Sequence, residues 1–227
     1  MNNLILIPAR KGSKGLRNKN IKNYNGKPLI EHTLNECQKL KFKNTEILVS
    51  TDCKVTQRIS KKYGYHHNYR RPKNISKDKT NIIDTVIHCV EWFKEKKSLE
   101  IKNVILLQPT SPLRTAQEII RSIKIYRRLG LESLASVTLA IQDPNEIVTI
   151  KSNKMKPLIK NNSSFQRQNY KDKYFFIDGS IYISSIKSLK KNKSFFHKST
   201  FPFYLNKKYS IDINDIDDFN AAIKLSK

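Results

Sequence analysis

Cysteine is scarce in this sequence, which has only Cys37, Cys53 and Cys89 among its 227 residues. They are odd in number, scattered and never part of a Cys-x-x-Cys pair, which argues against a disulfide framework and against structural zinc. No base partner accompanies Cys53, and the five histidines fall in no ligand spacing or triad, so nucleophilic catalysis has no support. We expect a cytoplasmic protein, because a reducing compartment suits free thiols.

Long hydrophobic runs are also missing. The apolar stretch nearest the start of the sequence, residues 4–7, is broken by Pro8 and Arg10. It is too short for the apolar region of a signal peptide or for a membrane span, so we expect no membrane partner. A hydrophobic content of 38%, with ten Tyr and ten Phe, argues against a disordered chain. We expect a single domain over residues 1–227, with a buried core.

Acidic residues are few: 19 Asp and Glu stand against 44 Lys and Arg, which gives a formal net charge of +25. One interpretation is attraction to a polyanion, above all nucleic acid. The other is compositional, because Lys, Asn, Ile, Tyr and Phe are abundant throughout, as an A/T-rich genome would produce. The basic clusters at 61–62, 94–97, 190–193 and 207–208 are spread along the chain. The charge alone therefore selects no partner.

The pattern that is present alternates strands with helices. Short apolar runs at residues 4–8, 46–50 and 104–108 are typical of buried parallel strands, and residues 28–40 and 82–93 have helical periodicity. This alternation predicts an α/β fold, a Rossmann-like and mostly parallel sheet flanked by helices. Ligands of such sheets bind beyond the carboxyl ends of the strands, so the following loops are the candidate site.

Residues 143–173 depart from this pattern. Short β patterns alternate there with polar turns, which predicts a small β-rich insert, either an antiparallel excursion or a dimerisation arm, before residues 177–183 return to the sheet. Elsewhere, Thr115 and Glu118 form a capping-box pattern that opens a helix, and Asp215 suits the N-cap of the final helix.

The loop after the first predicted strand, within residues 7–20, has the composition of a phosphate-binding loop. Neither GxGxxG nor GxxxxGK[ST] is present. The loop nevertheless offers flexible backbone, a hydroxyl and positive charge. The residues that supply them are Gly12, Gly15, Ser13, Arg10, Lys14 and Lys19. The alternative is a basic surface loop.

Six motifs occur in order between residue 7 and about residue 219: ARKGSKGLRNKN, NGKPLIEHT, VSTD, LLQPTSPLRT, GSIYI and SIDIND. With them the chain resembles the CMP-N-acylneuraminate synthetases, the cytidylyltransferases that activate nine-carbon acidic sugars for cell-surface polysaccharide biosynthesis. The resemblance implies a nucleotide-diphospho-sugar transferase fold and a homodimer. It also implies a reaction in which CTP and a 2-keto-3-deoxy sugar acid give a CMP-sugar and pyrophosphate, with Mg²⁺ as cofactor.

On the nucleotide side, the resemblance implies that Arg10 and Lys19 hold the triphosphate and act as the catalytic cations. Ser13, Lys14 and Asn20 would shape the same loop.

Arg71 and Asp78 correspond to the nucleotide-facing loop of the family. This chain has Lys79 between Asp78 and Thr80, where the family usually runs Asp-Thr or Asp-Asp-Thr.

On the sugar side, the resemblance points to Gln108, Arg167, Tyr182, Phe195 and Phe196. An arginine suits the sugar carboxylate because its fork matches two oxygens. The alternatives are ordinary core or interface aromatics, a surface cation for Arg167 and a buried structural amide for Gln108.

Asp212 is the candidate catalytic metal ligand, with Asn214 beside it. The family usually has Asp-Ile-Asp here, two carboxylates that would face the same side of a strand. One carboxylate, an amide oxygen and the substrate phosphates could still hold Mg²⁺. Asp215 would point to the opposite face.

The sequence thus favours a cytidylyltransferase for N-acylneuraminate. Sister enzymes for legionaminic, pseudaminic or Kdo acid stay open, although the Kdo branch usually has Ser-Arg where this chain has Ser13-Lys14. A basic nucleic-acid-binding protein and a nucleotide-binding module without activity are the alternatives of other classes. No specific nucleic acid is expected as a partner, since no recognised binding module is present.

Overall fold

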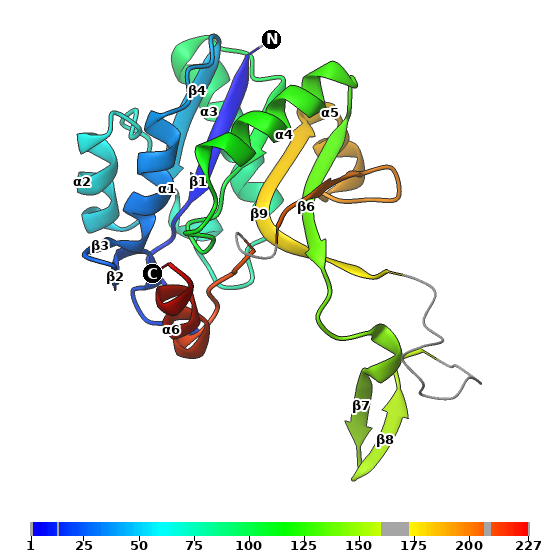
Figure 1. Cartoon of the computed structure of the whole chain (residues 1–227). Helices are drawn as coiled ribbons and strands as arrows, with labels where there is room; N and C mark the ends of the chain where they lie inside the picture. Colours follow the sequence, from blue (N-terminus) through cyan, green and yellow to red (C-terminus); the bar gives the residue numbers. More distant parts are fainter. Residues whose placement is uncertain (1, 13, 160–172, 207–209, 227) are drawn as a thin grey trace.

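A computed structural model describes residues 2–12, 14–159, 173–206 and 210–226 of the chain. Its main sheet has the strand order β4-β1-β5-β9-β6-β10 (Figure 1). The strands are β1 (Asn3–Pro8), β4 (Thr45–Ser50), β5 (Asn103–Leu106), β6 (Ser133–Leu139), β9 (Phe175–Ser185) and β10 (Phe201–Tyr204). β9 runs antiparallel to β5 and β6, whereas the other pairings are parallel. The predicted mostly parallel α/β sheet is confirmed, with one reversed strand.

Helices cover both faces of this sheet, with α1 and α4 on one side and α3 and α5 on the other (Figure 1). The helices are α1 (Leu29–Gln38), α2 (Lys54–Lys62), α3 (Ile82–Lys97), α4 (Ala116–Arg128), α5 (Ile186–Asn192) and α6 (Ile216–Leu225). Single 3-10 turns occur at Lys19–Ile21, Lys73–Ile75 and Pro144–Glu146, and a short pair, β2 (Asn23–Tyr24) and β3 (Lys27–Pro28), precedes α1.

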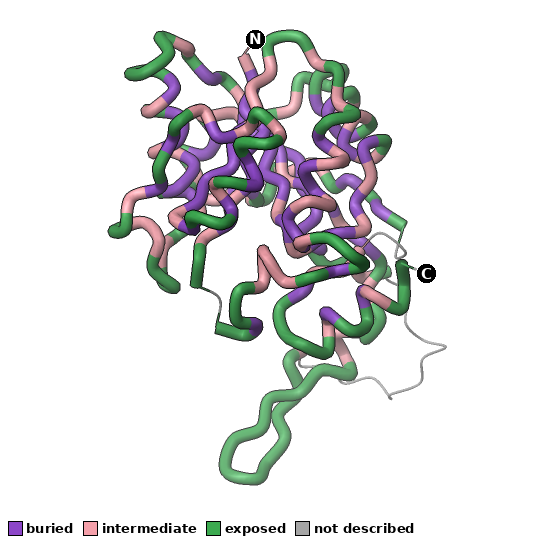
Figure 2. Tube along the Cα trace, turned by 90° about the vertical axis from the view of Figure 1, so that its left-hand side faces the viewer, coloured by how far each residue is buried: buried purple, intermediate pink, exposed green. Residues whose placement is uncertain are grey.

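The alternation of side chains in β1 explains why the core has two halves. Ile5 and Ile7 face the layer of α1 and α4, while Leu4 and Leu6 face the layer of α3, and all four are fully buried. A strand whose two faces are both covered needs a continuous apolar run, as the sequence has here. Figure 2 shows the resulting buried interior, which holds the strand ends in place.

Two helix starts follow the predicted capping chemistry to different extents. The Thr115 hydroxyl accepts from the Glu118 amide, but the Glu118 carboxylate pairs with Arg121 at 2.8 Å. At α6, Asp215 and Asp218 form a complete capping box, so the N-cap prediction for Asp215 is confirmed.

The third predicted strand ends earlier than expected. It was predicted to reach Gln108, but β5 ends at Leu106. Pro109 has no amide hydrogen to donate to a neighbouring strand, and it restricts the residue before it, so the chain turns away there. Gln108 therefore lies in the loop beyond the sheet.

Within the predicted insert, β7 (Val148–Lys151) and β8 (Lys154–Pro157) form an antiparallel hairpin. It projects from the body of the molecule and is exposed along its length (Figures 1 and 2). Ser152 and Asn153 have positive φ angles of 47° and 60°, which suit a tight two-residue turn. The antiparallel excursion is thus confirmed for the described residues, while residues 160–172 lie outside them. No helix in the described ranges is long and apolar enough to cross a membrane.

Candidate functional site

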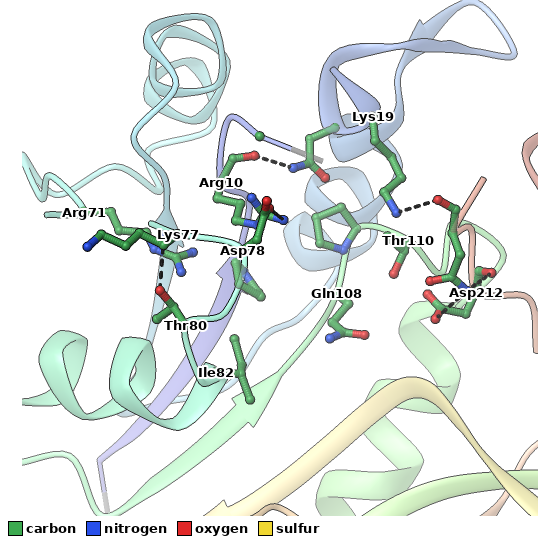
Figure 3. A pocket seen from close by; sticks show the side chains of 15 residues that line it. Arg10, Lys19, Arg71, Lys77, Asp78, Thr80, Ile82, Gln108, Thr110 and Asp212 are labelled. Carbon is green, nitrogen blue, oxygen red and sulfur yellow. Dashed lines mark hydrogen bonds and ion pairs between the residues drawn. The ribbon is translucent and has the colours of Figure 1, made fainter. Parts of the chain in front are cut away.

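A hollow of about 290 Å³ opens beyond the carboxyl ends of β1 and β5, where the sequence predicts the site (Figure 3). Its walls come from the loop after β1, the loop before α3, the loop after β5 and the segment before α6. The residues that line it are Pro8, Arg10, Gly12, Lys19, Asn20, Arg71, Lys77, Asp78, Thr80, Ile82, Gln108, Pro109, Thr110, Asp212 and Asn214. We call it the cationic hollow, because four of the residues that line it are Arg or Lys.

The loop after β1 is held against the segment before α6. The Lys19 ammonium donates to the carbonyl oxygens of Ile213 at 2.7 Å and Asn214 at 3.4 Å. A Cβ on Gly15 would lie 2.3 Å from the Asn214 carbonyl oxygen, so this close approach requires glycine. Leu16 and Ile213 are buried in the same small cluster. The predicted phosphate loop therefore borders the predicted metal ligands.

Arg10 and Lys19 both line the cationic hollow, as the resemblance implied. The Asn20 amide donates to the Arg10 carbonyl oxygen at 3.1 Å, which fixes the backbone of the loop (Figure 3). Burial lowers the pKa of Lys19 from its usual value, and the negative charge of Asp212 partly opposes this shift. Lys14 is largely exposed beside Asp78, and Ser13 lies outside the described residues.

Arg71 reaches the cationic hollow from a buried position. Its guanidinium donates to the Ile75 carbonyl oxygen at 3.0 and 2.6 Å and to the Thr85 hydroxyl at 2.8 Å. Burial lowers the pKa of Arg71. These contacts tie the loop before α3 to that helix, so Arg71 shapes the wall as well as lining it. Lys79 is exposed and does not line the hollow.

Asp212 and Asn214 both line the cationic hollow, while Ile213 between them is fully buried on the opposite side. The predicted shared face is confirmed, but the segment belongs to no strand of the described sheet. Its alternation is held instead by the Ile213 amide, which donates to the Thr110 carbonyl oxygen at 2.9 Å. Tertiary hydrogen bonding, rather than the expected strand pairing, therefore keeps Asp212 and Asn214 on one face.

The donor set of this segment fits Mg²⁺. The Asn214 side-chain amide donates to Asp212 Oδ2 at 3.3 Å, which leaves the Asn214 Oδ1 and the rest of the Asp212 carboxylate as oxygen ligands. Mg²⁺ is typically bound by one or two carboxylates together with waters and substrate phosphates. Among the described residues, no cluster of three or more His, Cys, Asp or Glu side chains could hold a metal. A magnesium ion here would therefore need ligands from a substrate.

A second hollow, also about 290 Å³, adjoins the first and contains four of the five predicted sugar-binding residues. We call it the aromatic hollow. Gln108, Tyr182, Phe195 and Phe196 line it, and it shares Gln108 and Ile82 with the cationic hollow.

The aromatic side chains of this hollow differ in exposure. Phe195 is buried and contacts the Tyr182 ring at a centroid distance of 5.6 Å, while Phe196 is 52% exposed. Burial raises the pKa of Tyr182 to about 12, so its hydroxyl stays protonated at neutral pH. Arg167 lies outside the described residues.

Three contributors escaped the sequence reasoning. Thr110 lines the cationic hollow, and Gly179, with φ +77°, places its backbone against Gln108 and Asp212. Arg114 is buried and donates to the carbonyl oxygen of Gln108, a residue of both hollows. Arg114 could have been noticed in the sequence, because it is the one charged residue of the motif LLQPTSPLRT, which begins with an apolar run.

The cysteines take no part in either hollow. All three are free and buried. Burial raises the pKa of the Cys37 thiol to about 12 and that of Cys89 to about 11, so neither is a thiolate near neutral pH.

Comparison with known proteins identifies the chain's family. A sequence profile described as Cytidylyltransferase matches residues 4–214. The chain belongs to the cytidylyltransferase family. Cytidylyltransferases are nucleotidyltransferases, so we assign the chain to that class of enzymes.

Individual relatives agree with this assignment. The chain is 34% identical to the CMP-N,N'-diacetyllegionaminic acid synthase of Legionella pneumophila, over 98% of this chain and 95% of the relative. It is 28% identical to the N-acylneuraminate cytidylyltransferase of Streptococcus agalactiae, over 98% of this chain, but it spans only 53% of that longer protein. The fold matches a CMP:2-keto-3-deoxy-manno-octonic acid synthetase structure with a TM-score of 0.69 at 16% identity, over 100% of this chain and 98% of the other.

Proposed function

We propose that this cytidylyltransferase transfers CMP from CTP to the anomeric hydroxyl of a nonulosonic acid and releases pyrophosphate. The observation that carries the proposal is the contiguity of two unlike hollows. The cationic hollow suits a triphosphate, the aromatic hollow suits a sugar, and Gln108 and Ile82 belong to both. Substrates bound in both would meet at that boundary, which is the positioning that a group transfer requires.

On the nucleotide side, Arg10 and Lys19 supply positive charge to the triphosphate. Both belong to the segment that follows β1, which is held in place by the Asn20 and Lys19 hydrogen bonds described above. Fixed charges stabilise the charge that develops on a transferring phosphoryl group without reorganisation during the reaction. Asp78 acts on CTP through Arg10, with which it pairs.

On the sugar side, Gln108, Tyr182 and Phe196 offer an amide, a protonated hydroxyl and an exposed ring. Such a mixture suits a sugar, whose faces are apolar and whose edges carry hydroxyl groups. Phe195 supports the Tyr182 ring from the core. Arg167, assigned from the resemblance, remains the proposed partner of the sugar carboxylate.

At the phosphorus the reaction forms one bond and breaks one, and the anomeric hydroxyl gives up its proton to water. The anomeric oxygen attacks the α-phosphorus of CTP in line, the new O–P bond forms, and the bond from the α-phosphorus to the bridging oxygen breaks as pyrophosphate leaves. Asp212 and Asn214 would hold Mg²⁺, which neutralises phosphate charge when bound. Arg10 and Lys19 hold the departing pyrophosphate.

Two sugar acids are the candidate substrates. N-acylneuraminate follows from the sequence motifs, and legionaminate is supported by the relative that matches this chain at 34% identity over nearly the whole length of both. Pseudaminate and Kdo are further sister possibilities. Pyrophosphate release by the purified protein with CTP and each acid in turn tests the proposal, and the ratio of kcat/KM values ranks the acids.

The proposed assembly is a homodimer that uses the β7–β8 hairpin. Ile150 pairs with Met155 and Val148 with Pro157 across the hairpin, which puts four apolar side chains on one face. Ile150 is 70% and Met155 74% exposed. A second copy of the chain would bury this ribbon. We further propose a cytoplasmic location, where the free thiols would stay reduced.

A further inference from the structure

Arg114 is a buried charged side chain that bonds to the backbone of Gln108, a residue of both hollows. It is 3% exposed, and burial lowers the pKa of its guanidinium to about 10, still well above neutral pH. Its guanidinium donates to two carbonyl oxygens and a hydroxyl oxygen rather than to a carboxylate. Burying a charge in this way is costly unless its hydrogen bonds are made well, so the contacts are informative.

The guanidinium joins three elements. Its Nη1 donates to the Gln108 carbonyl oxygen at 3.1 Å and to the Ser180 carbonyl oxygen at 2.7 Å, and its Nη2 donates to the Thr33 hydroxyl at 2.8 Å. It thereby links the loop after β5 to β9 and to α1. The planar fork of an arginine can make these bonds at once, whereas a lysine cannot.

The two carbonyl groups that Arg114 holds adjoin the reacting region. A Cβ built on Gly179 would lie 3.3 Å from Gln108 Oε1 and 3.7 Å from the Asp212 carboxyl carbon. Thr110, two residues after Gln108, accepts from the Ile213 amide at 2.9 Å. Both Gln108, which lines the two hollows, and the proposed metal ligand Asp212 are therefore placed by the backbone that Arg114 fixes.

We propose that Arg114 is a positioning residue for the sugar side of the reaction: it holds Gln108 against β9 and, through Thr110, holds the Asp212 segment. The roles of Gln108 and Asp212 in this inference rest on the proposed function, whereas the contacts of Arg114 do not. Arg114 bonds the Gln108 backbone directly, whereas it reaches Lys19 only indirectly, through Thr110 and the Ile213 and Asn214 carbonyl groups. Loss of Arg114 should therefore impair use of the sugar acid more than binding of CTP.

The test is Arg114→Lys, which keeps the charge and loses the fork. We expect kcat/KM for the sugar acid to fall by roughly 10²-fold, the effect of displacing a reacting group by about 1 Å. The KM for CTP should change less than this, because Arg114 bonds the Gln108 backbone directly but reaches Lys19 and Asp212 only through Thr110. The assay uses CTP with N-acylneuraminate and with legionaminate. Arg114→Gln, which keeps amide donors, is the second variant if Arg114→Lys does not fold.

Thr33→Val is the matched control. It removes the Arg114 bond to α1, keeps the bonds to the Gln108 and Ser180 carbonyl oxygens, and should leave both KM values within about 2-fold. If Arg114 merely supported the fold, Thr33→Val and Arg114→Lys would lower the melting temperature and raise the two KM values in parallel. That parallel behaviour would overturn the proposal.

Hydrogen exchange separates this inference from the proposed function. In the 227-residue protein, Arg114→Lys should exchange faster at the amides of residues 107, 108, 110, 111 and 212–214, with α3 unchanged. If wild type turns over neither acid, the proposed function fails, yet the exchange comparison still decides whether Arg114 holds these segments. Unchanged exchange there would refute the positioning role.

Discussion

Arg10 and Asp78 form an ion pair of 2.6 Å across the mouth of the cationic hollow. The pair joins the loop after β1 to the loop before α3, and Lys14 lies 3.8 Å from the same carboxylate. The Asp78 carboxylate thus neutralises part of the positive charge that would otherwise be available to a triphosphate. Incoming CTP must compete with Asp78 for Arg10 or share it.

The first prediction follows from this competition. Asp78→Asn should lower the KM for CTP by about 2- to 5-fold, in keeping with the small strength of a part-exposed ion pair. The difference between variant and wild type should shrink at high salt, because salt screens such charges. Initial rates over a CTP series at two salt concentrations provide the measurement. A higher KM in the variant would mean that Asp78 orients Arg10 instead.

Lys19 and Arg10 should each be essential for turnover. Replacing either by Ala removes a fixed charge from the triphosphate site and should lower turnover by about 10²-fold or more. Arg10→Lys should also be poor, because a point charge does not replace a fork. Steady-state kinetics check these values, with circular dichroism as the folding control. A wild-type rate in Lys19→Ala would contradict the proposal that this loop binds the triphosphate.

The pH dependence gives a separate test of Lys19. Burial lowers its pKa, so the ammonium of the free enzyme loses its proton at a lower pH than an ordinary lysine, whose pKa is about 10.4. As pH rises, the kcat/KM for CTP should therefore begin to fall at a lower pH than the titration of an ordinary lysine would give. Lys19→Arg, which stays charged, should shift the fall to higher pH. Superimposable alkaline limbs would show that another group titrates.

Gly15 and Gly12 make a matched pair. Gly15→Ala would put a Cβ 2.3 Å from the Asn214 backbone oxygen, whereas Gly12→Ala would meet the flexible end of Arg10 at 3.0 Å. We expect Gly15→Ala to lower the free energy of unfolding by about 1–3 kcal/mol, as overpacking does, and to lower turnover. Gly12→Ala should be milder in both respects. Equal denaturation midpoints for the two variants would refute the close approach.

The metal prediction rests on a single carboxylate. Asp212→Asn should reduce turnover to near background, because Asn214 alone offers no negative charge to a cation. Asn214→Asp should lower the Mg²⁺ concentration that gives half the maximal rate. A magnesium titration of the three proteins is the measurement. If Asp212→Asn keeps the wild-type rate and magnesium requirement, the metal site lies elsewhere.

The hairpin prediction concerns assembly. Ile150→Glu places a charge on the apolar ribbon and should shift a dimer to monomer in sedimentation analysis, because a buried unpaired charge is costly. Thr149→Glu changes the opposite face of the same strand and should leave the dimer intact. A wild-type monomer, or equal behaviour of the two variants, would contradict the proposed interface.

The strands and the position of the loop after β1 could be predicted from the sequence because their signals are local. An apolar run such as residues 4–8 needs no partner to be identified, and the Gly- and Lys-rich loop directly follows it. The helix patterns were equally local: Leu29, Ile30, Thr33, Leu34 and Cys37 of α1 are all buried, as their spacing indicated.

The features that escaped prediction depend on long-range contacts. Arg114 bonds to Ser180, 66 residues away, and no local pattern announces that contact. The segment around Asp212 looked like a strand because its side chains do alternate, but the hydrogen bond from the Ile213 amide to the Thr110 carbonyl oxygen takes the place of strand pairing. The close approach of Gly179 to Gln108 likewise arises only once β9 enters the sheet antiparallel.

The central claim is that the two hollows act together on CTP and a nonulosonic acid. Pyrophosphate release with CTP and Mg²⁺, with N-acylneuraminate, legionaminate, pseudaminate or Kdo, tests it most directly. We predict release that requires CTP and at least one of the nine-carbon acids, and that is lost in Lys19→Ala. No release with any acid, together with sub-micromolar nucleic-acid binding at about 200 mM salt, would contradict the account and make the +25 charge the functional feature.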